Sequence, residues 1–291
     1  MFDATARTGI VLEDFMRHNF INLAGGALTL LLVGAVSSAQ ADIIAQDNAG
    51  DPLYTGGGNY NGLNGGTGFQ PWIVSPTGNG STNGAFIGDA TQNAGGAQGV
   101  NGVNINSSGA KSFALYANDF YNGLATRPLI NTLAVGQTFS LDFDNGYVDN
   151  GAIAGFEFGN AGANNGFVLS FQGGTSRYRV SDGTGGSAYY DTSIGFTGTG
   201  LHADFTLTSP TQYSLSLRDI NSSAAPYTTT GTLAATSVDR LTVFDYGAGA
   251  GTDRNVYANN LSVTTPAPSA LIPMAGGLTV LFGSLKRRKR K

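Results

Sequence analysis

The sequence predicts an all-β protein folded as an antiparallel β-sandwich. The 291 residues include 44 glycines and only 12% charged residues, and Asn, Thr and Ser are frequent. Such a composition suits short strands joined by tight turns, because Gly and Asn tolerate positive φ and Thr suits a pleated surface. The middle of the chain also alternates between apolar and polar residues in short runs that end at Gly, Asn, Asp or Pro, as half-buried strands require.

Six runs show this alternation most clearly, and we expect a strand in each: residues 112–116, 138–144, 166–171, 202–207, 212–217 and 239–244. Two hairpins follow from their spacing. Residues 167–171 are expected to pair with 177–180 across two glycines, and residues 205–207 with 213–217 across Ser-Pro-Thr. More than ten such strands at close spacing predict one sandwich domain of jelly-roll or concanavalin-like type over residues 42–264.

The least regular part of this domain is residues 48–110. It contains Tyr60, Trp72, Phe86 and Ile87, which are unusual in a disordered linker. We therefore expect long loops and edge strands that pack onto the sandwich, with Trp72 anchored by its ring.

An apolar run over residues 21–36 precedes small residues that include Ala39 and Ala41. This order predicts a secretory signal peptide over residues 1–41, cleaved after Ala41. The acidic residues in front of the run do not suit the start of a signal peptide, so we expect Met16 to be the true start. The alternative is a buried helix of the fold.

The C-terminal segment, residues 265–291, has three parts. A Pro-rich break is followed by an apolar stretch over residues 270–285 and by six basic residues, Lys286, Arg287, Arg288, Lys289, Arg290 and Lys291. Sixteen helical residues span about 24 Å, less than the ~30 Å of a hydrocarbon core, so the predicted transmembrane helix is short for a permanent anchor. The basic block is expected to stay on the cytoplasmic side as a stop-transfer signal.

This order of parts resembles the PEP-CTERM sorting signal of exosortase substrates. Its motif stands here as Pro266, Ala267, Pro268 and Ser269, with Ala267 where the family usually has Glu. The sequence VGQTFSLDFDNG over residues 135–146 is also similar to sequences in β-sandwich ectodomains of proteins with this tail. The resemblance supplies no catalytic residues.

The resemblance implies export through the Sec translocon, cleavage by signal peptidase and handling by an exosortase-like protease. The protein would be held in the inner membrane through residues 270–285 for a time and then reach the cell envelope, the outer surface or the extracellular matrix. Two alternatives remain open: a single-pass anchor that is never cleaved, and a basic tail that binds nucleic acid or anionic lipid.

Charge and cysteine content exclude several classes of function. Residues 42–265 contain 16 acidic and 7 basic residues, a net charge of about −9, which disfavours nucleic-acid binding by this domain. There is no cysteine, so disulfides and thiolate chemistry are excluded. One histidine after residue 41 and no cysteine also exclude an ordinary zinc site.

The domain carries few groups suited to catalysis. A glycosidase normally needs two carboxylates, and Glu157 is the only glutamate after residue 41. The alternation places Glu157 outward between two inward phenylalanines, and it places Asp142 and Asp144 on one face of a strand. His202 lies within a strand with no Gly-x-Ser-x-Gly elbow before it, so a hydrogen-bonded strand histidine is favoured over a Ser–His–Asp triad. We expect a protein that is not an enzyme.

Calcium is the one cofactor that the sequence suggests. Asp142, Asp144 and Asp149, with the Asn and Gly residues between them, offer the oxygen ligands that calcium prefers. Asp and Asn beside Gly more often form turns, so we expect no cofactor and keep calcium as the alternative.

The function expected from these features is a structural or adhesive role at the cell envelope or in the extracellular matrix, with exopolysaccharide as a candidate partner. An alternative is a lectin-like carbohydrate-binding module whose exposed aromatic residues, Trp72, Tyr116, Tyr189 and Tyr190, stack on sugar rings. A third reading is an aspartate-dependent glycan hydrolase.

Overall fold

A computed structural model describes residues 40–77, 82–92, 104–118, 121–161, 166–184 and 188–267. The predicted signal helix and Ala39, and at the other end Pro268, Ser269, the apolar stretch and the basic block, lie outside the described residues. Residues Ala39–Ser269 form one compact unit. None of the short helical turns in the described part of the chain has the length and apolar character needed to cross a membrane.

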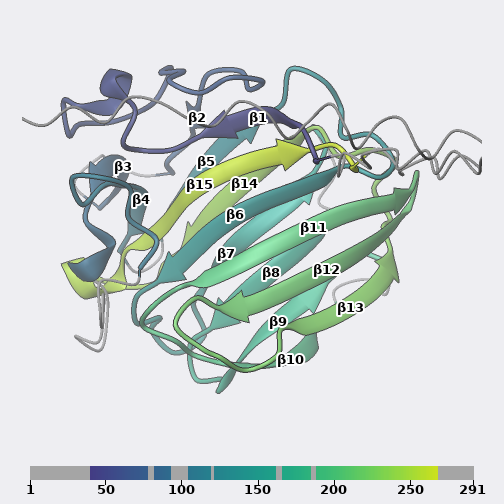
Figure 1. The fold of residues 1–291 in the computed structure, drawn as a ribbon. Coiled ribbons are helices and arrows are strands. Elements are labelled where there is room, and N and C mark those ends of the chain that lie inside the picture. Colours follow the sequence, from purple (N-terminus) through teal and green to yellow (C-terminus); the bar gives the residue numbers. More distant parts are fainter. Residues whose placement is uncertain are drawn as a thin grey trace, which may run out of the picture. The chain divides into compact units, whose positions relative to one another are not determined.

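The described strands form two antiparallel sheets (Figure 1). The first sheet has the order β13 (Tyr227–Thr232), β12 (Gln212–Asp219), β11 (Leu201–Ser209), β6 (Thr138–Asn145), β15 (Val256–Thr264), β4 (Ser112–Ala117) and β3 (Asn83–Gly88), and β1 (Ile43–Asp47) also pairs with β15. The second sheet has the order β10 (Tyr190–Gly195), β9 (Arg177–Ser181), β8 (Phe167–Gln172), β7 (Ile153–Gly159), β14 (Arg240–Tyr246), β5 (Asn122–Pro128) and β2 (Ile73–Val74). Single 3-10 turns occur at Pro52–Tyr54, Ala90–Gln92 and Thr252–Arg254.

All six runs predicted from the alternation form strands, namely β4, β6, β8, β11, β12 and β14. Both predicted hairpins are also present. Strand β8 pairs with β9, and in the second hairpin Phe205 of β11 lies opposite Leu215 of β12. The antiparallel β-sandwich expected from the sequence is therefore confirmed.

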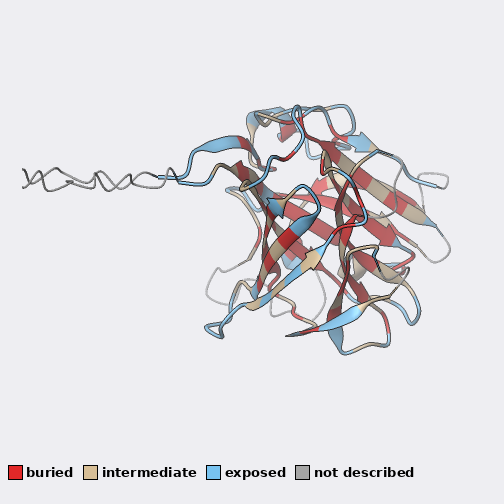
Figure 2. Ribbon diagram, turned by 90° about the vertical axis from the view of Figure 1, so that its right-hand side faces the viewer, coloured by how far each residue is buried: buried red, intermediate tan, exposed pale blue. Residues whose placement is uncertain are grey.

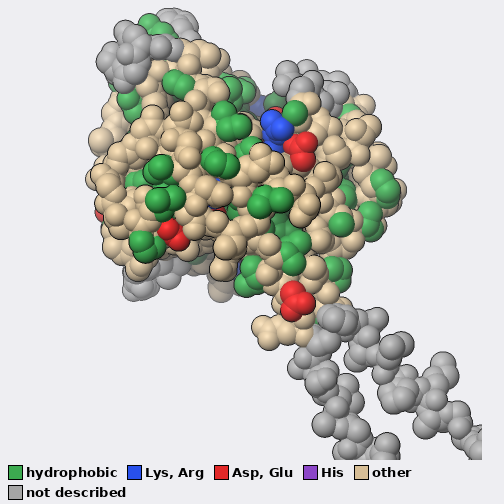
Figure 3. All heavy atoms as spheres, turned by 90° about the horizontal axis from the view of Figure 1, so that it is seen from above, with side chains coloured by type: hydrophobic (Ala, Val, Ile, Leu, Met, Phe, Trp, Pro, Cys, Tyr) green, Lys and Arg blue, Asp and Glu red, His purple; other side chains and the backbone are tan. Residues whose placement is uncertain are grey.

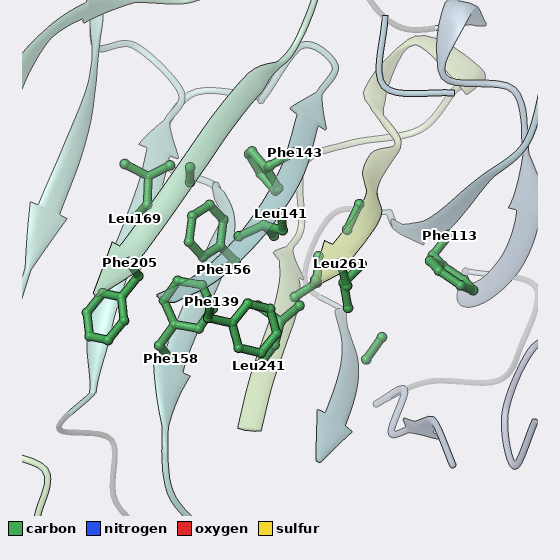
Figure 4. Packing of buried hydrophobic residues seen from close by; sticks show 14 of the residues in the cluster. Phe113, Phe139, Leu141, Phe143, Phe156, Phe158, Leu169, Phe205, Leu241 and Leu261 are labelled. Atoms are coloured by element: carbon green, nitrogen blue, oxygen red, sulfur yellow. The ribbon is translucent and has the colours of Figure 1, made fainter. Parts of the chain in front are cut away.

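The core lies between the two sheets and consists mainly of aromatic and aliphatic side chains (Figure 4). Along β11 every second residue from Leu201 to Leu207 is buried. Figure 2 shows buried residues alternating with partly buried ones along several strands of the sandwich. Rings from β6 meet rings from β7: the centroids of Phe139 and Phe158 are 4.8 Å apart, and those of Phe143 and Phe156 are 5.3 Å apart. Tilted and edge-on aromatic pairs of this kind stabilise the contact beyond simple burial.

Strand β15 is a central strand whose one edge is shared by two partners. Strand β4 pairs with Val256–Ala258, and β1 pairs with the stretch from Leu261 to Thr264. Between them the pairing with β6 shifts register, and Asn260 adopts φ 50°. The fully buried side chain of Asn259 accepts a hydrogen bond from the backbone N–H of Ala49 (2.9 Å) and donates to carbonyls of the loop before β4. Asn259 therefore fastens two N-terminal segments to the sheet.

The irregular region packs on the sandwich as expected. Tyr54, Tyr60 and Trp72 are each 1% exposed, so Trp72 anchors this region by its ring. Tyr54 and Trp72 contact a buried ion pair between Arg127 of β5 and Asp47 of β1. Burial raises the pKa of Asp47 to about 6, although the Arg127 charge opposes this shift.

Candidate functional site

The outward face of the first sheet carries polar side chains in register across five strands. Side chains on alternate positions of each strand share one face, and the pairing brings them into rows across the sheet. The first row is formed by Thr230, Ser214, Thr206, Thr138 and Thr264. The second row is formed by Thr228, Ser216, Asp204, Ser140 and Ser262. Nine of these ten side chains are uncharged hydroxyls.

Beside the second row, two residues from Asp204 along β11, His202 lies between two carboxylates. Its Nδ1 is 2.6 Å from Asp142 Oδ1, and its Nε2 is 3.2 Å from Asp204 Oδ1. The carboxylates are themselves held: Asn260 Nδ2 donates to Asp142 Oδ2 (2.7 Å), and the Ser140 hydroxyl donates to Asp204 Oδ1 (2.6 Å). A connected polar network thus runs across β11, β6 and β15.

This network holds His202 in its charged form. Hydrogen bonds to Asp142 and then to Asp204 raise the pKa of His202 to about 9, although partial burial opposes the shift. Burial alone would raise the pKa of Asp204, but the bonds from His202 and Ser140 and the charge of Arg218 together lower it.

The arrangement differs from a Ser–His–Asp triad in two respects. The Ser140 hydroxyl donates to Asp204 and not to the imidazole, and both ring nitrogens of His202 face carboxylates. A protonated imidazole cannot accept a proton from a nucleophile, which a general base must do. The expectation of a hydrogen-bonded strand histidine is therefore supported by the contacts.

A shallow groove of about 380 Å³ lies over β11, β12 and β13, next to this network. Its lining consists mainly of hydroxyl-bearing side chains from both rows, with one carboxylate: Asp204, Thr206, Ser214, Leu215, Ser216, Thr228, Thr229 and Thr230. The groove therefore presents many hydrogen-bond donors and acceptors and little charge.

A second hollow, of about 410 Å³, lies where β5 begins and β14 ends, beside the loop between β6 and β7. Tyr246, the last residue of β14, is 41% exposed and forms part of the lining. The other lining residues are Asn122, Asp149, Asn150, Gly151, Ala152 and Gly247.

The three aspartates expected to bind calcium make different contacts. Asp142 faces His202, Asp149 pairs with Arg254 at 3.1 Å, and Asp144 is 1% exposed. Asp142 and Asp144 do share the outward face of β6, as the alternation predicts. In the described part of the chain, no three His, Cys, Asp or Glu side chains lie close enough together to hold a metal ion. The calcium site stays a prediction.

The aromatic residues expected to stack on sugars differ in exposure. Trp72 is buried because it packs against Tyr60 and Phe113, so its ring cannot stack on a ligand. The expectation that Trp72 is an exposed sugar-stacking residue was therefore wrong. Tyr190 is 59% exposed, whereas the Tyr189 ring contacts the Arg179 guanidinium at 4.9 Å. Tyr116 is half-buried.

Glu157 lies on the outward face of β7 between buried Phe156 and Phe158, as expected. Its carboxylate accepts a hydrogen bond from the backbone N–H of Gly166, and burial raises its pKa. It lines neither of the two hollows.

Sequence reasoning missed Ser140, Asp204, Asn260 and Tyr246 as site residues. A signal existed for the first two: Ser140 lies two residues from Asp142, and Asp204 lies two residues from His202, so each pair shares a strand face. No local signal places β6 beside β11.

No family model matches the chain, and no curated protein matches it either. Solved structures do show similarity. A Bacillus licheniformis β-glucanase is 14% identical with a TM-score of 0.41, and the match covers 72% of this chain and 96% of that one. A Bacillus subtilis protein of unknown function with a galectin-like fold is 11% identical with a TM-score of 0.38, covering 67% and 90%. The HCR/D F1240A mutant is 12% identical with a TM-score of 0.37, covering 69% of this chain but only 44% of that longer one.

Proposed function

We propose that this chain is an exported, non-catalytic β-sandwich that adheres to polysaccharide of the cell envelope or extracellular matrix through the outward face of its first sheet. The observation that carries the proposal is the pair of hydroxyl-rich rows with the groove above them. Ser and Thr hydroxyls both donate and accept hydrogen bonds, which matches the hydroxyl groups of a sugar polymer.

The dimensions of the rows support a polymeric ligand. Five neighbouring strands at about 4.8 Å spacing extend over about 19 Å, enough for several sugar units in line. The groove is open and shallow, and Asp204 is the one charged residue among the described residues that line it. Figure 3, which views the molecule from above, shows that charged side chains are also sparse on that side. An uncharged surface favours a neutral chain over an anionic one, because no dense cationic patch would compensate the negative charges.

The state of His202 supports a binding role over a hydrolytic one. Asp204 lines the groove, and both Asp204 and Asp142 are within hydrogen-bond distance of the imidazolium between them. A glycosidase needs one protonated carboxyl group and one free carboxylate beside the scissile bond. Here the hydrogen bonds from His202 and Ser140 lower the pKa of Asp204.

The export part of the proposal is supported by the two terminal segments of the sequence. The test is mass spectrometry of the protein recovered from the envelope fraction of an expressing bacterium. We expect a mature N-terminus at Asp42 and loss of residues 286–291. Retention of Lys286 to Lys291 on the surface-associated protein would contradict processing of the tail and leave a plain anchor.

The binding part is tested with the full-length chain purified in mild detergent. The readout is retention on cellulose, chitin and immobilised neutral exopolysaccharide. The variant Thr206→Val/Ser214→Ala/Thr230→Val removes three hydroxyls of the first row with little change in shape, and we expect it to lose most of the retention.

The matched control is Thr126→Val/Thr242→Val on the outward face of the second sheet, where the two hydroxyls lie 3.2 Å apart. This control should bind like the wild type. Equal binding by both variants would contradict the assignment of the face, and no binding of the wild type to any of the polymers would contradict the function.

A further inference from the structure

We propose that the hollow beside Tyr246 is a second, separate site that binds one or two neutral pyranose units. Among the residues that the structure describes, none lines both this hollow and the groove on the first sheet. The ligand class rests on the proposed function, but the site is argued from its own geometry.

The aromatic wall of the hollow is held in a fixed orientation. The rings of Tyr246 and Phe244 are stacked with centroids 4.8 Å apart and an interplanar angle of 17°. Phe244 is 5% exposed and lies over Gly155, where an added Cβ would be 2.7 Å from Phe244 Cζ. The 41% exposure of Tyr246 therefore leaves a pre-oriented ring beside the hollow, as a sugar-stacking site requires.

The polar wall is also fixed before any ligand binds. In the loop between β6 and β7 the backbone N–H of Asp149 donates to Ala248 O (2.9 Å), and that of Gly151 donates to Gly173 O (3.1 Å). The Asp149 carboxylate is positioned by Arg254 Nε at 3.1 Å and remains half exposed. A preformed loop avoids the entropy cost of ordering on binding.

The chemistry of the lining selects the ligand class. Carboxylate and amide groups come from Asp149, Asn122 and Asn150, which suit sugar hydroxyls, and Tyr246 suits the apolar face of a pyranose ring. The described residues that line the hollow include no Lys or Arg, which disfavours uronic acids and sulfated or phosphorylated sugars. The volume of about 410 Å³ falls in the usual range of small-ligand pockets, about 300–1,000 Å³.

With two separate sites, one molecule could hold a polymer along the first sheet and a short or terminal segment at Tyr246. Binding of two segments by one molecule cross-links polysaccharide chains, which is the property that a matrix component needs.

The test uses full-length protein in mild detergent with cellobiose, maltose and lactose as probes, followed by saturation-transfer NMR and calorimetry. We expect at least one of the disaccharides to bind the wild type. Tyr246→Ala should weaken that binding by about tenfold or more through loss of the ring, and Tyr246→Phe should keep it.

Two further variants keep the test independent of folding. Asn122→Ala leaves the aromatic wall in place and should also weaken binding, whereas Tyr190→Ala removes a tyrosine that is 59% exposed outside the hollow and should not. Disaccharide binding should survive in the triple variant of the first row.

Lack of binding of all three disaccharides to the wild type, or unchanged binding by Tyr246→Ala, would overturn the second site. Polymer retention by the first sheet would remain measurable in either case. Conversely, disaccharide binding without polymer retention would overturn the proposed function and leave the hollow intact.

Discussion

Arg127 Nη2 lies 2.6 Å from Asp47 Oδ2, and neither side chain is exposed to solvent. The guanidinium also donates to Asn64 Oδ1 (2.7 Å) and contacts the Gln70 carbonyl, and the rings of Phe69 and Trp72 lie against it. The pair therefore joins β1 and the irregular N-terminal region to β5 of the second sheet.

Removal of one partner of this pair should destabilise the protein strongly. We expect Arg127→Met to lower the free energy of unfolding by about 3–5 kcal/mol, because Asp47 would be left as an uncompensated buried carboxylate. Urea denaturation measures the change. The control is Arg240→Met, which removes a partly exposed pair with Asp239 and should cost about 0–1 kcal/mol. An equal fall in the free energy of unfolding for both variants would contradict the view that the Arg127–Asp47 pair is more important because it is buried.

The protonation of His202 gives a pH dependence with a defined sign. Its pKa is raised from the usual 6.5 to about 9, so the imidazolium stabilises the folded state. This contribution is fully present below pH 6.5 and is lost as the pH rises through 9. With discount for partial exposure it amounts to about 2 kcal/mol.

The titration of His202 is measured directly by NMR of the imidazole nitrogens, with a His18→Gln variant to assign the signals. We expect a midpoint near 9 in the wild type and a lower one in Asp142→Asn. A midpoint near 6.5 in the wild type would show that the two carboxylates do not hold the ring.

Asn259 should be more important for stability than its polar character suggests. Asn259→Leu keeps the approximate shape but removes the bonds to Ala49 N–H and to the carbonyls of Ile105 and Lys111. We expect the free energy of unfolding to fall by about 2–4 kcal/mol, since buried backbone groups lose their partners. Hydrogen exchange at Ala49 should also accelerate. Asn221→Leu, in the exposed turn after β12, serves as the control, and protection at Ala49 equal to that of the control would contradict the assignment.

Gly155 is required because Phe244 and the neighbouring strand leave no room for a side chain. An added Cβ would collide with the carbonyl oxygen of Leu169 and with the Phe244 ring. Gly155→Ala should therefore lower the melting temperature, with a cost of about 1–3 kcal/mol. At Gly56 an added Cβ meets nothing within 4 Å, so Gly56→Ala should be close to neutral. An unchanged melting temperature in Gly155→Ala would show that Leu169 and Phe244 do not lie as close to Gly155 as described.

The calcium prediction can be tested by chelation. Asp142 and Asp149 already contact His202 and Arg254, so we expect the melting temperature to be the same with EDTA and with added calcium chloride. A lower melting temperature in EDTA that added calcium reverses would instead support a calcium site. An Asp144→Asn variant would then show whether Asp144 is one of its ligands.

The strands of this fold could be predicted where one face is apolar and the other polar. Phe139, Leu141 and Phe143 alternate with polar residues along β6, and that local pattern is enough to identify the strand and its buried face. Hairpins were also predictable, because the turn fixes the register of β8 with β9 and of β11 with β12.

Contacts between strands far apart in the sequence could not be predicted in this way. The placement of His202 between Asp142 and Asp204 depends on the register of β6 against β11. That register is set by packing of the whole sandwich and not by any local turn. The same holds for the buried Arg127, whose contacts with Asp47, Phe69 and Trp72 join parts of the chain that are distant in the sequence. Trp72 was correctly expected to anchor the irregular region but wrongly expected to stack on sugars. Whether a side chain is buried depends on packing partners that the local sequence does not identify.

The central position of β15 has a consequence for biosynthesis. This strand is the last of the sandwich along the chain, yet β6, β4 and β1 all depend on it for hydrogen-bond partners. The first sheet is therefore incomplete until residue 264 has been made, and until then a nascent chain exposes the edges of β6, β4 and β1 that β15 later covers. Such a chain would fold late and slowly, since its contacts join distant parts of the sequence. Under the proposed export, this delay would keep the chain unfolded, and so able to be translocated, until synthesis is almost finished.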